Sequence, residues 1–249
     1  MNREAYLQAA QLVSRSSRAV ALTGAGISTP SGIRDFRSPG TGHWSQVDPT
    51  EVASINAFLR HPERFYRWFA ASWQEIVSAC PNPAHEALAE MERRGILRAV
   101  VTQNIDGLHQ KAGSREVLEL HGNARQAICL RCGSQQRTEG VLERFVRTGE
   151  APRCSCGGLI KPDVVLFGEM LPADVLRRAQ AEIAHCDLLL VIGSSLVVMP
   201  AADLPWLAIH SGAPVIVCNR EETWVDRFAR AVLREDVALS VPALLQELG

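Results

Sequence analysis

Residues 19–28 read Ala19-Val20-Ala21-Leu22-Thr23-Gly24-Ala25-Gly26-Ile27-Ser28, and the rest of the chain is organised around this stretch. The apolar run predicts a buried strand, which stops at two glycines separated by a single small residue. Because glycine has no Cβ, such a turn lets backbone N–H groups approach a phosphate. A complete dinucleotide fingerprint would carry a third glycine where Thr29 stands. The stretch alone therefore leaves two alternatives open, a phosphate cradle and a tight turn between strand and helix.

The next segment, residues 31–40, favours the phosphate cradle. It reads Ser-Gly-Ile-Arg-Asp-Phe-Arg-Ser-Pro-Gly, a run too polar and too rich in glycine for an ordinary helix. A carboxylate, an aromatic ring and a guanidinium follow one another at Asp35, Phe36 and Arg37. These side chains directly after a glycine turn point to a ligand site.

Length and charge limit the class of protein. A chain of 249 residues can bury a substantial core, in one α/β domain or in a main domain with a smaller insertion. The formal net charge of −1 provides no overall basic field, so we expect neither nucleic acid nor a membrane as a partner. No apolar segment is long enough to span a bilayer, and the first residues lead into a helical pattern instead of a secretory signal. We expect a cytoplasmic protein.

Four apolar strands each end in small or polar residues. The strands are predicted at 19–22, 97–102, 187–192 and 215–218, with helical patterns between them. Strands that alternate with helices predict a mainly parallel sheet with right-handed crossovers. The residues that follow the strands are Gly24-Ala25-Gly26, Gln103-Asn104-Ile105-Asp106, Gly193-Ser194-Ser195 and Asn219-Arg220-Glu221. In a parallel sheet all of them lie along one edge, which predicts a crevice of dinucleotide size.

Four of the seven cysteines form two close pairs, Cys129-x-x-Cys132 and Cys154-x-Cys156. Zinc favours four thiolates in a tetrahedron, and such a closed shell leaves no position for water, so we predict one structural zinc ion. An odd cysteine count with three scattered members favours a reduced protein over a disulfide framework. A zinc ribbon can also read nucleic acid, but few basic or aromatic residues occur in its loops. We therefore interpret it as a scaffold.

Together these residues closely resemble the sirtuins of the bacterial type, a family of NAD-dependent protein-lysine deacylases. The resemblance covers nearly the whole chain, in order, through segments 24–28, 32–37, 102–109, 120–122, the cysteine pairs, 162–169, 193–195 and Asn219. Two positions depart from the family pattern. Arg34 stands where the family usually has proline, and the second cysteine pair is one residue shorter than usual. Neither departure removes a reacting group.

The resemblance implies a single catalytic domain over residues 1–249, of α/β class. Its large part is a Rossmann-like parallel sheet with helices on both faces, formed by residues 1–36, 84–125 and 160–249. Its small part comes from two insertions, a helical one at 37–83 and the zinc module at 126–159. Acyl-lysine would enter the cleft between the two parts. The oligomeric state is left open, and a monomer is compatible with the sequence.

The resemblance also implies which residues hold NAD. The glycine turn would cradle the pyrophosphate, Phe36 would shield the reacting ribose, Arg37 would lie over the cofactor, and Asp106 would bind the nicotinamide carboxamide. The full set of implied cofactor contacts is Gly24, Ala25, Gly26, Asp35, Phe36, Arg37, Gln103, Asn104, Ile105, Asp106, Gly193, Ser194, Ser195, Asn219, Glu221 and, on the adenine side, Val237.

The chemistry of the implied reaction assigns a role to His121. After nicotinamide leaves, the amide oxygen of acyl-lysine can attack the ribose, and a base must then deprotonate a ribose hydroxyl. Histidine suits this role because its ordinary pKa is about 6.5. An isolated Leu-His-Gly would more often hold a core or turn histidine, but the surrounding motifs favour the general base. The resemblance also implies a catalytic role for Asn104, which would hold the nicotinamide pocket together with Asp106.

Substrate contacts are implied on two segments. Val164, Phe167 and Gly168 would pair with the substrate backbone as an added strand, and Val165 would line the lysine channel. Aromatic side chains between residues 58 and 73 either form a buried helix face or line an apolar pocket. Sirtuins that remove succinyl or malonyl groups carry Tyr-x-x-Arg, and an ungapped alignment puts Phe69 and Ser72 there. We therefore expect uncharged acyl groups, acetyl or longer.

Three other functions remain as alternatives. ADP-ribosyl transfer or simple NAD hydrolysis shares the first bond cleavage with deacylation. A zinc-stabilised NAD-binding module could sense NAD without catalysis. A hydride-transferring dehydrogenase fits poorly because the third glycine is missing.

Overall fold

The computed structural model describes residues 3–35 and 48–246. Its helices are α1 (Arg3–Arg15), α2 (Pro49–Val52), α3 (Ile55–Arg60), α4 (Pro62–Ser78), α5 (Pro83–Arg93), α6 (Leu108–Ala112), α7 (Thr138–Thr148), α8 (Ala173–Ala184), α9 (Pro205–His210) and α10 (Val237–Gln246). Its strands are β1 (Ala19–Thr23), β2 (Leu97–Thr102), β3 (Val117–Glu119), β4 (Gly122–Cys129), β5 (Gln135–Arg137), β6 (Ile160–Val164), β7 (Leu188–Ile192), β8 (Val215–Cys218) and β9 (Ala231–Leu233). Among these described residues, no helix combines the length and the apolarity needed to cross a membrane.

Six strands form a parallel sheet in the order β3-β2-β1-β7-β8-β9. This is the order of a doubly wound dinucleotide-binding fold, in which the chain reverses direction across the sheet beside β1. Thr23 pairs with Thr102 on one side and with Ile192 on the other, so the ends of β1, β2 and β7 are level. The predicted convergence of strand ends at one sheet edge is confirmed.

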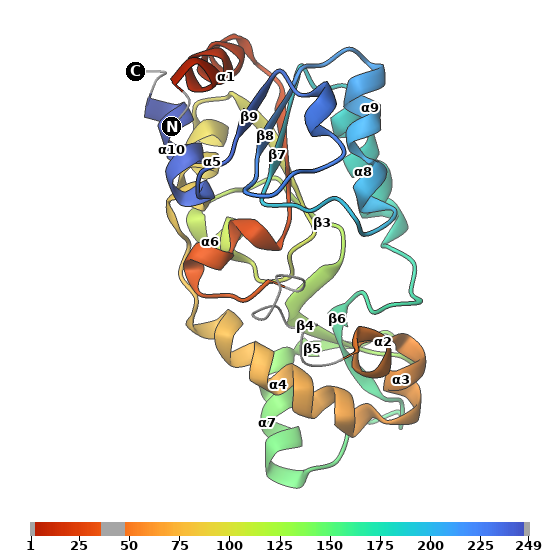
Figure 1. Ribbon diagram of the computed structural model, residues 1–249. Helices are drawn as coiled ribbons and strands as arrows, with labels where there is room; N and C mark the ends of the chain where they lie inside the picture. Colours follow the sequence, from red (N-terminus) through yellow and green to blue (C-terminus); the bar gives the residue numbers. More distant parts are fainter. Residues whose placement is uncertain (1–2, 36–47, 247–249) are drawn as a thin grey trace.

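Helices cover both faces of the large sheet. Side chains alternate along each strand, so Ala19 and Ala21 pack towards α1, α5 and α10, whereas Val20 and Leu22 pack towards α8 and α9. Figure 1 shows the two helical layers on either side of the sheet. Every β1 residue is buried, as the apolar run predicts for a strand covered on both faces. The predicted Rossmann-like fold class is confirmed.

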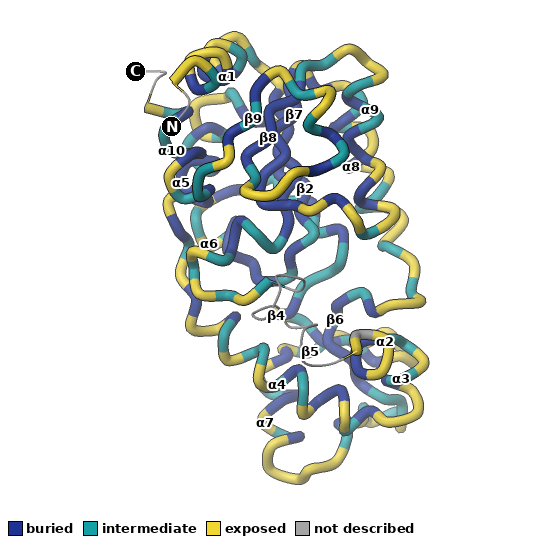
Figure 2. The backbone as a smooth tube through the Cα atoms, viewed as in Figure 1, coloured by how far each residue is buried: buried dark blue, intermediate teal, exposed yellow. Residues whose placement is uncertain are grey.

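A smaller unit lies beyond the sheet edge (Figure 1). It contains the antiparallel sheet β5-β4-β6 together with α3, α4 and α7. Tyr66 of α4 joins these elements, because its ring stacks on Phe145 of α7 at 5.1 Å and its hydroxyl donates to the Ile160 carbonyl of β6 at 2.7 Å. In Figure 2, β2, β7 and β8 are buried over most of their length, whereas the turn after α7 is exposed.

Some element boundaries differ from the sequence predictions. The strand expected over 160–167 ends at Val164, because the backbone of Phe167 pairs instead with the segment between α2 and α3. The helical region 50–79 divides into three helices. Strand β9 and helix α10 have no predicted counterpart. The domain boundaries stay a prediction, and the one at residue 125 falls inside β4.

Candidate active site

A cavity of about 820 Å³ lies where the strand ends of the large sheet face the small unit. Its size is within the range of small-molecule and cofactor sites. The segments after β1, β2, β7 and β8 all contribute to its wall, as predicted. The predicted site residues on the wall are Gly24, Ala25, Gly26, Asp35, Phe69, Gln103, Asn104, Ile105, His121, Val164, Val165, Phe167, Gly168, Gly193, Ser194, Ser195, Asn219, Glu221 and Val237. Phe36 and Arg37 lie outside the described residues.

The glycine turn after β1 packs directly on the turn after β7. Gly26 N–H donates to the Gly193 carbonyl at 2.8 Å, and a Cβ on Gly24 or Gly26 would lie within 2.9 Å of that same oxygen. Gly193 has φ +58°, and a Cβ there would lie 2.2 Å from the Ile27 nitrogen. Glycine is therefore needed at positions 24, 26 and 193 for the turns after β1 and β7 to pack together, even before a ligand is considered.

Asn104 is held from two sides at the centre of the cavity wall. Its side-chain amide donates to the Gly24 carbonyl at 3.1 Å and to Ser28 Oγ at 3.0 Å. Its backbone N–H donates to Thr102 Oγ1 at 3.1 Å. These contacts tie the segment after β2 to the glycine turn, and they fix which way the amide oxygen points.

Asp106 lies behind the main cavity, on the wall of an adjoining pocket of about 50 Å³. Its carboxylate accepts from Ser28 Oγ at 2.7 Å and from the Leu108 N–H at 2.8 Å. The pocket shares Ala25, Asn104 and Ile105 with the main cavity. Among the described members of the predicted cofactor set, Asp106 is the one that lines the second pocket without also lining the main cavity.

Two buried histidines, His85 and His109, lie behind Ser28 and β1. Their rings are 4.9 Å apart, and His109 Nε2 lies 3.0 Å from Thr23 Oγ1. Burial lowers the pKa of His85 to about 4 and that of His109 to about 3, and for His109 the neighbouring His85 adds to the effect. Both rings are therefore neutral at physiological pH.

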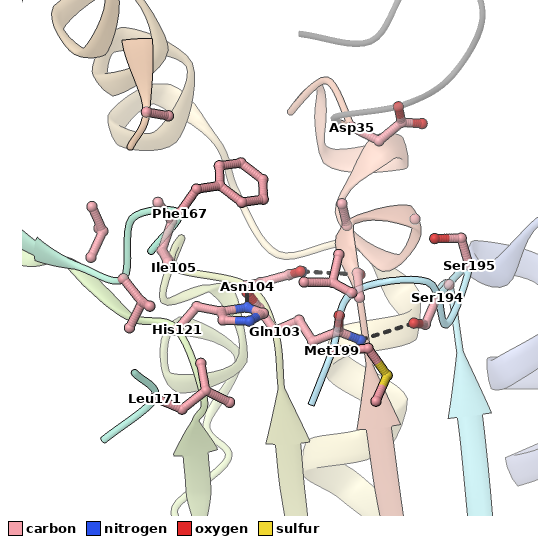
Figure 3. Close-up of a pocket in the computed structure, with 18 of the residues that line it drawn as sticks. Asp35, Gln103, Asn104, Ile105, His121, Phe167, Leu171, Ser194, Ser195 and Met199 are labelled. Atoms are coloured by element: carbon pink, nitrogen blue, oxygen red, sulfur yellow. Dashed lines mark hydrogen bonds between the residues drawn. The ribbon is translucent and has the colours of Figure 1, made fainter. Parts of the chain in front are cut away.

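His121 follows β3 and is oriented by one backbone contact. Its Nδ1 lies 2.9 Å from the Gln103 carbonyl. A carbonyl can only accept, so Nδ1 carries the proton and Nε2 is left as the acceptor of the neutral ring. Burial lowers the pKa of His121, and the bond to Gln103 opposes this shift. Figure 3 shows His121 beside Asn104 and Gln103 at the cavity wall. A histidine held in this way can accept a proton at neutral pH.

Gln103 connects His121 to the turn after β7. Its side-chain amide donates to Ser194 Oγ at 2.9 Å, and the same hydroxyl accepts the Leu196 N–H at 3.3 Å. The segments after β1, β2 and β7 thus form one hydrogen-bonded wall, which is shown in Figure 3.

The backbone N–H and carbonyl of Phe167 both have hydrogen-bond partners within the protein. Its N–H donates to the Ala53 carbonyl at 2.9 Å, and its carbonyl accepts the Ile55 N–H at 3.0 Å. The predicted pairing of Phe167 with a substrate strand therefore competes with an existing contact, and an added strand has to use neighbouring backbone groups such as those of Gly168. The ring of Phe167 is 39% exposed and remains at the cavity, as Figure 3 shows.

Phe69 and Ser72 both lie on the wall of the smaller pocket. Phe69 is buried and stacks on Phe65 with a centroid distance of 5.4 Å. Arg34 also reaches this pocket, although the sequence prediction gave it no partner. Its Nε donates to Glu75 Oε1 of α4 at 2.9 Å, so its charge is compensated within the protein.

The four predicted zinc ligands meet in the small unit. The sulfur atoms of Cys129, Cys132, Cys154 and Cys156 all lie within 4.8 Å of one another. The Cys129–Cys156 and Cys132–Cys154 separations are 3.5 and 3.7 Å. Zn–S bonds of about 2.3 Å in a tetrahedron place sulfurs about 3.8 Å apart, so the thiol set fits one zinc ion despite the short second pair.

Comparison with known proteins identifies the family. The model of the Sir2 family matches residues 24–200. The chain belongs to the Sir2 family. It is 47% identical over 237 residues to "NAD-dependent protein deacetylase 2" of Caldanaerobacter subterraneus subsp. tengcongensis, covering 95% of this chain and 93% of the relative. It is 46% identical over 243 residues to "NAD-dependent protein deacylase 2" of Archaeoglobus fulgidus, covering 97% of this chain and 95% of the relative.

Solved Sir2 structures share the fold over the full length. A complex described as Sir2, p53 peptide and NAD+ superimposes with a TM-score of 0.89 at 42% identity, covering 99% of this chain and 98% of that one. A Sir2 enzyme bound to a propionylated peptide gives a TM-score of 0.89 at 41% identity, with the same coverages of 99% and 98%. The neighbours were thus solved with the two kinds of ligand that the sequence of this Sir2 chain predicts.

Several residues of the Sir2 cavity had no signal in the sequence. They are Leu176 of α8, the apolar loop residues Leu171, Val198 and Met199, and the carboxylate of Asp236. Leu171 and Met199 approach the cavity from opposite loops in Figure 3. An apolar loop residue resembles a core residue in the sequence. Exposure would have distinguished Met199, which is 59% exposed, but exposure requires the fold.

Proposed function

We propose that this Sir2 chain is an NAD-dependent protein-lysine deacylase, which moves the acyl group of lysine to ADP-ribose and releases nicotinamide. The observation that carries the proposal is the position of His121, whose ring is held by the Gln103 carbonyl at the cavity where the strand ends meet. The names of its relatives and the ligands of its structural neighbours support the same activity. We also propose a cytoplasmic location, which the seven free cysteines support.

The residues on the cavity wall fit NAD by the chemistry of their donors and acceptors. Amides from Gln103 and Asn104 and hydroxyls from Ser194 and Ser195 line the same wall as the glycine turn. The cofactor-binding set and the catalytic pair keep the roles proposed for them from the sequence. When bound, NAD supplies the ribose that receives the acyl group.

His121 provides the proton acceptor in this scheme. With Nδ1–H donating to Gln103, the free electron pair of Nε2 takes the proton from the hydroxyl that attacks the acyl group. Burial, which lowers the pKa of His121, keeps the ring in its neutral, basic form at physiological pH. Asn104 holds its amide beside the same wall through Gly24 and Ser28.

We propose uncharged acyl groups, acetyl or longer, as substrates. The wall near the small unit is apolar, with Trp68, Phe69 and Ile105 in common between the cavity and the smaller pocket. A carboxylate on the acyl chain would need a cation there. Among the described residues on the wall of the smaller pocket the one guanidinium is Arg34, which already pairs with Glu75.

One assay tests the proposal against its alternatives. Wild-type protein is incubated with NAD and acetylated or succinylated peptide, and NAD and peptide are both followed by mass spectrometry. We expect deacetylation that depends strictly on NAD, little desuccinylation, and a loss of about 100-fold or more in His121→Ala, as for removal of a general base. The matched control is His210→Ala, which replaces an exposed histidine away from the cavity.

The other outcomes each point to a different activity. NAD consumption without peptide deacetylation would indicate ADP-ribosyl transfer or hydrolysis. NAD binding without turnover would indicate a sensor. Efficient desuccinylation with little deacetylation would contradict the proposed acyl preference and leave the reaction class intact.

A further inference from the structure

Lys161 is a buried cation outside the residues assigned so far. It lies in β6, and its side chain is only 5% exposed. A buried ammonium group is costly unless it is both paired and hydrogen-bonded. Its contacts therefore show what the fold uses it for.

The contacts of Lys161 join the two ends of one short loop. Its Nζ donates to the Val164 carbonyl at 2.6 Å and to Glu169 Oε2 at 2.9 Å. Glu169 Oε2 also accepts the N–H of Leu166, in the middle of the loop, at 2.8 Å. One ammonium and one carboxylate thus fix the loop at its start, middle and end.

This loop forms one side of the cavity. Every residue from Val164 to Glu169 lies on the cavity wall. The loop also contacts the catalytic segment, because Val165 N–H donates to the His121 carbonyl at 2.9 Å. A shift of the loop would therefore alter the side of the cavity that faces the peptide, and not the opposite side formed by the glycine turn.

We infer that Lys161 is a positioning residue for the acyl-peptide, which acts through Glu169 to hold residues 164–169 in their binding shape. The inference rests on the proposed function for the identity of the ligand. Charge-assisted bonds in a buried setting are the strong kind, and they are made here before any ligand arrives. The loop is in this way pre-organised, so the peptide does not have to order it on binding.

The test compares Lys161→Met with wild type in steady-state kinetics and in peptide binding by fluorescence anisotropy. We expect the KM and the Kd for acetylated peptide to rise about tenfold or more, as for the loss of a charge-assisted hydrogen bond. The KM for NAD should stay within about twofold, because Lys161 and Glu169 make their hydrogen bonds within the loop. Lys161→Arg, which keeps the charge and the donors, should restore most of the peptide affinity.

Controls separate positioning from mere stability. Lys161→Met leaves the Glu169 carboxylate without its cation, which can destabilise the fold. The double variant Lys161→Met with Glu169→Gln removes that unpaired charge and is therefore expected to be less destabilised. Lys111→Met replaces the only other lysine of the sequence, whose Nζ donates to the Ala79 carbonyl, and should change neither KM. Hydrogen exchange at Leu166 should accelerate in the Lys161 variants and stay slow in the Lys111 variant.

Two results would overturn the inference. One is faster exchange at Leu166 with unchanged peptide affinity, since Lys161 would then only stabilise the fold. The other is an equal rise in the KM for peptide and for NAD. Absence of NAD-dependent deacetylation in wild type would instead contradict the proposed function, and the anisotropy measurement, which needs no turnover, would still decide the role of Lys161.

Discussion

Gly193 illustrates at the scale of one residue how the site is formed. It has a positive φ of 58°, and the space where a Cβ would lie is filled by the backbone of Gly26 and Ile27. Two requirements, a left-handed backbone and a close approach, therefore coincide at one position. Gly212 has a similar φ of 80° but nothing within 4 Å of its Cβ position, so only the first requirement applies there.

This pair of glycines gives a matched prediction. Gly212→Ala should lower the free energy of unfolding by about 1 kcal/mol, the cost of a left-handed alanine. Gly193→Ala should lower it by about 3 kcal/mol or more, because the backbone must also move. Urea unfolding followed by circular dichroism measures both values. An equal decrease in the free energy of unfolding in both variants would show that the close contact of Gly193 with the glycine turn does not contribute to stability.

Residue-level prediction from the sequence located residues at the cavity where a motif couples residue type to position. His121, Asn104 and the glycine turn reach the same cavity because each follows a strand whose end is fixed by the sheet. It was incomplete for Asp106 and Arg34. Their contacts with Ser28 and Glu75 join segments far apart in the chain, and no local pattern indicates such a distance.

At the scale of elements, the metal cluster connects the turn after β4 with the turn before β6. Gly158 allows this, because a Cβ there would lie 2.7 Å from Cys129 Sγ. The Arg131 N–H lies 3.4 Å from the same sulfur, a contact that stabilises thiolate charge. All four ligands of a tetrahedral zinc ion would be cysteine sulfurs of the protein, which is typical of a structural site.

Removal of the metal should therefore loosen β4, β5 and α7 and leave the large sheet folded. We expect one zinc per chain by elemental analysis, and in Cys132→Ser a zinc content near zero with a lower melting temperature. Cys80→Ser is the matched control, because Cys80 is an exposed cysteine outside the cluster and should keep the zinc. Retention of stoichiometric zinc in Cys132→Ser would contradict the assignment of the ligands.

Among the elements, those with a clear apolar pattern were predictable, and two without one, β9 and α10, were not. β1 and β7 are buried runs of five residues, and β2 is a run of six that is buried except at Arg98. β9 has three residues and α10 carries an internal proline, Pro242, so neither shows a clear periodicity. The end of β6 was misplaced because the partner of Phe167 is a loop distant in sequence.

At the scale of the whole molecule, the two buried histidines couple stability to pH. In the folded state the pKa of His85 is about 4 and that of His109 about 3, whereas in the unfolded chain each has the ordinary value of about 6.5. Above pH 6.5 neither ring is protonated in either state. Below it the unfolded chain binds protons that the folded chain does not, so stability falls as the pH decreases towards the folded values.

We therefore expect His85 and His109 together to lower the free energy of unfolding by about 3 kcal/mol between pH 7.5 and pH 5.5, about 1.4 kcal/mol from each. Urea unfolding at the two pH values measures it. His109→Gln should remove about half of this difference, and His210→Gln, which replaces an exposed ring, should remove none. If the free energy of unfolding does not change between the two pH values, the conclusion that His85 and His109 are buried in their neutral form is wrong.

The cavity takes one wall from the large sheet and the other from the two chain segments that make the small unit. A molecule bound there holds both units at once and adds its binding free energy to their association. The small unit supplies the wall that carries Phe69 and Val164, and the large sheet supplies the wall that carries the glycine turn. A ligand that bridges the two walls therefore makes the folding of the small unit depend on ligand concentration.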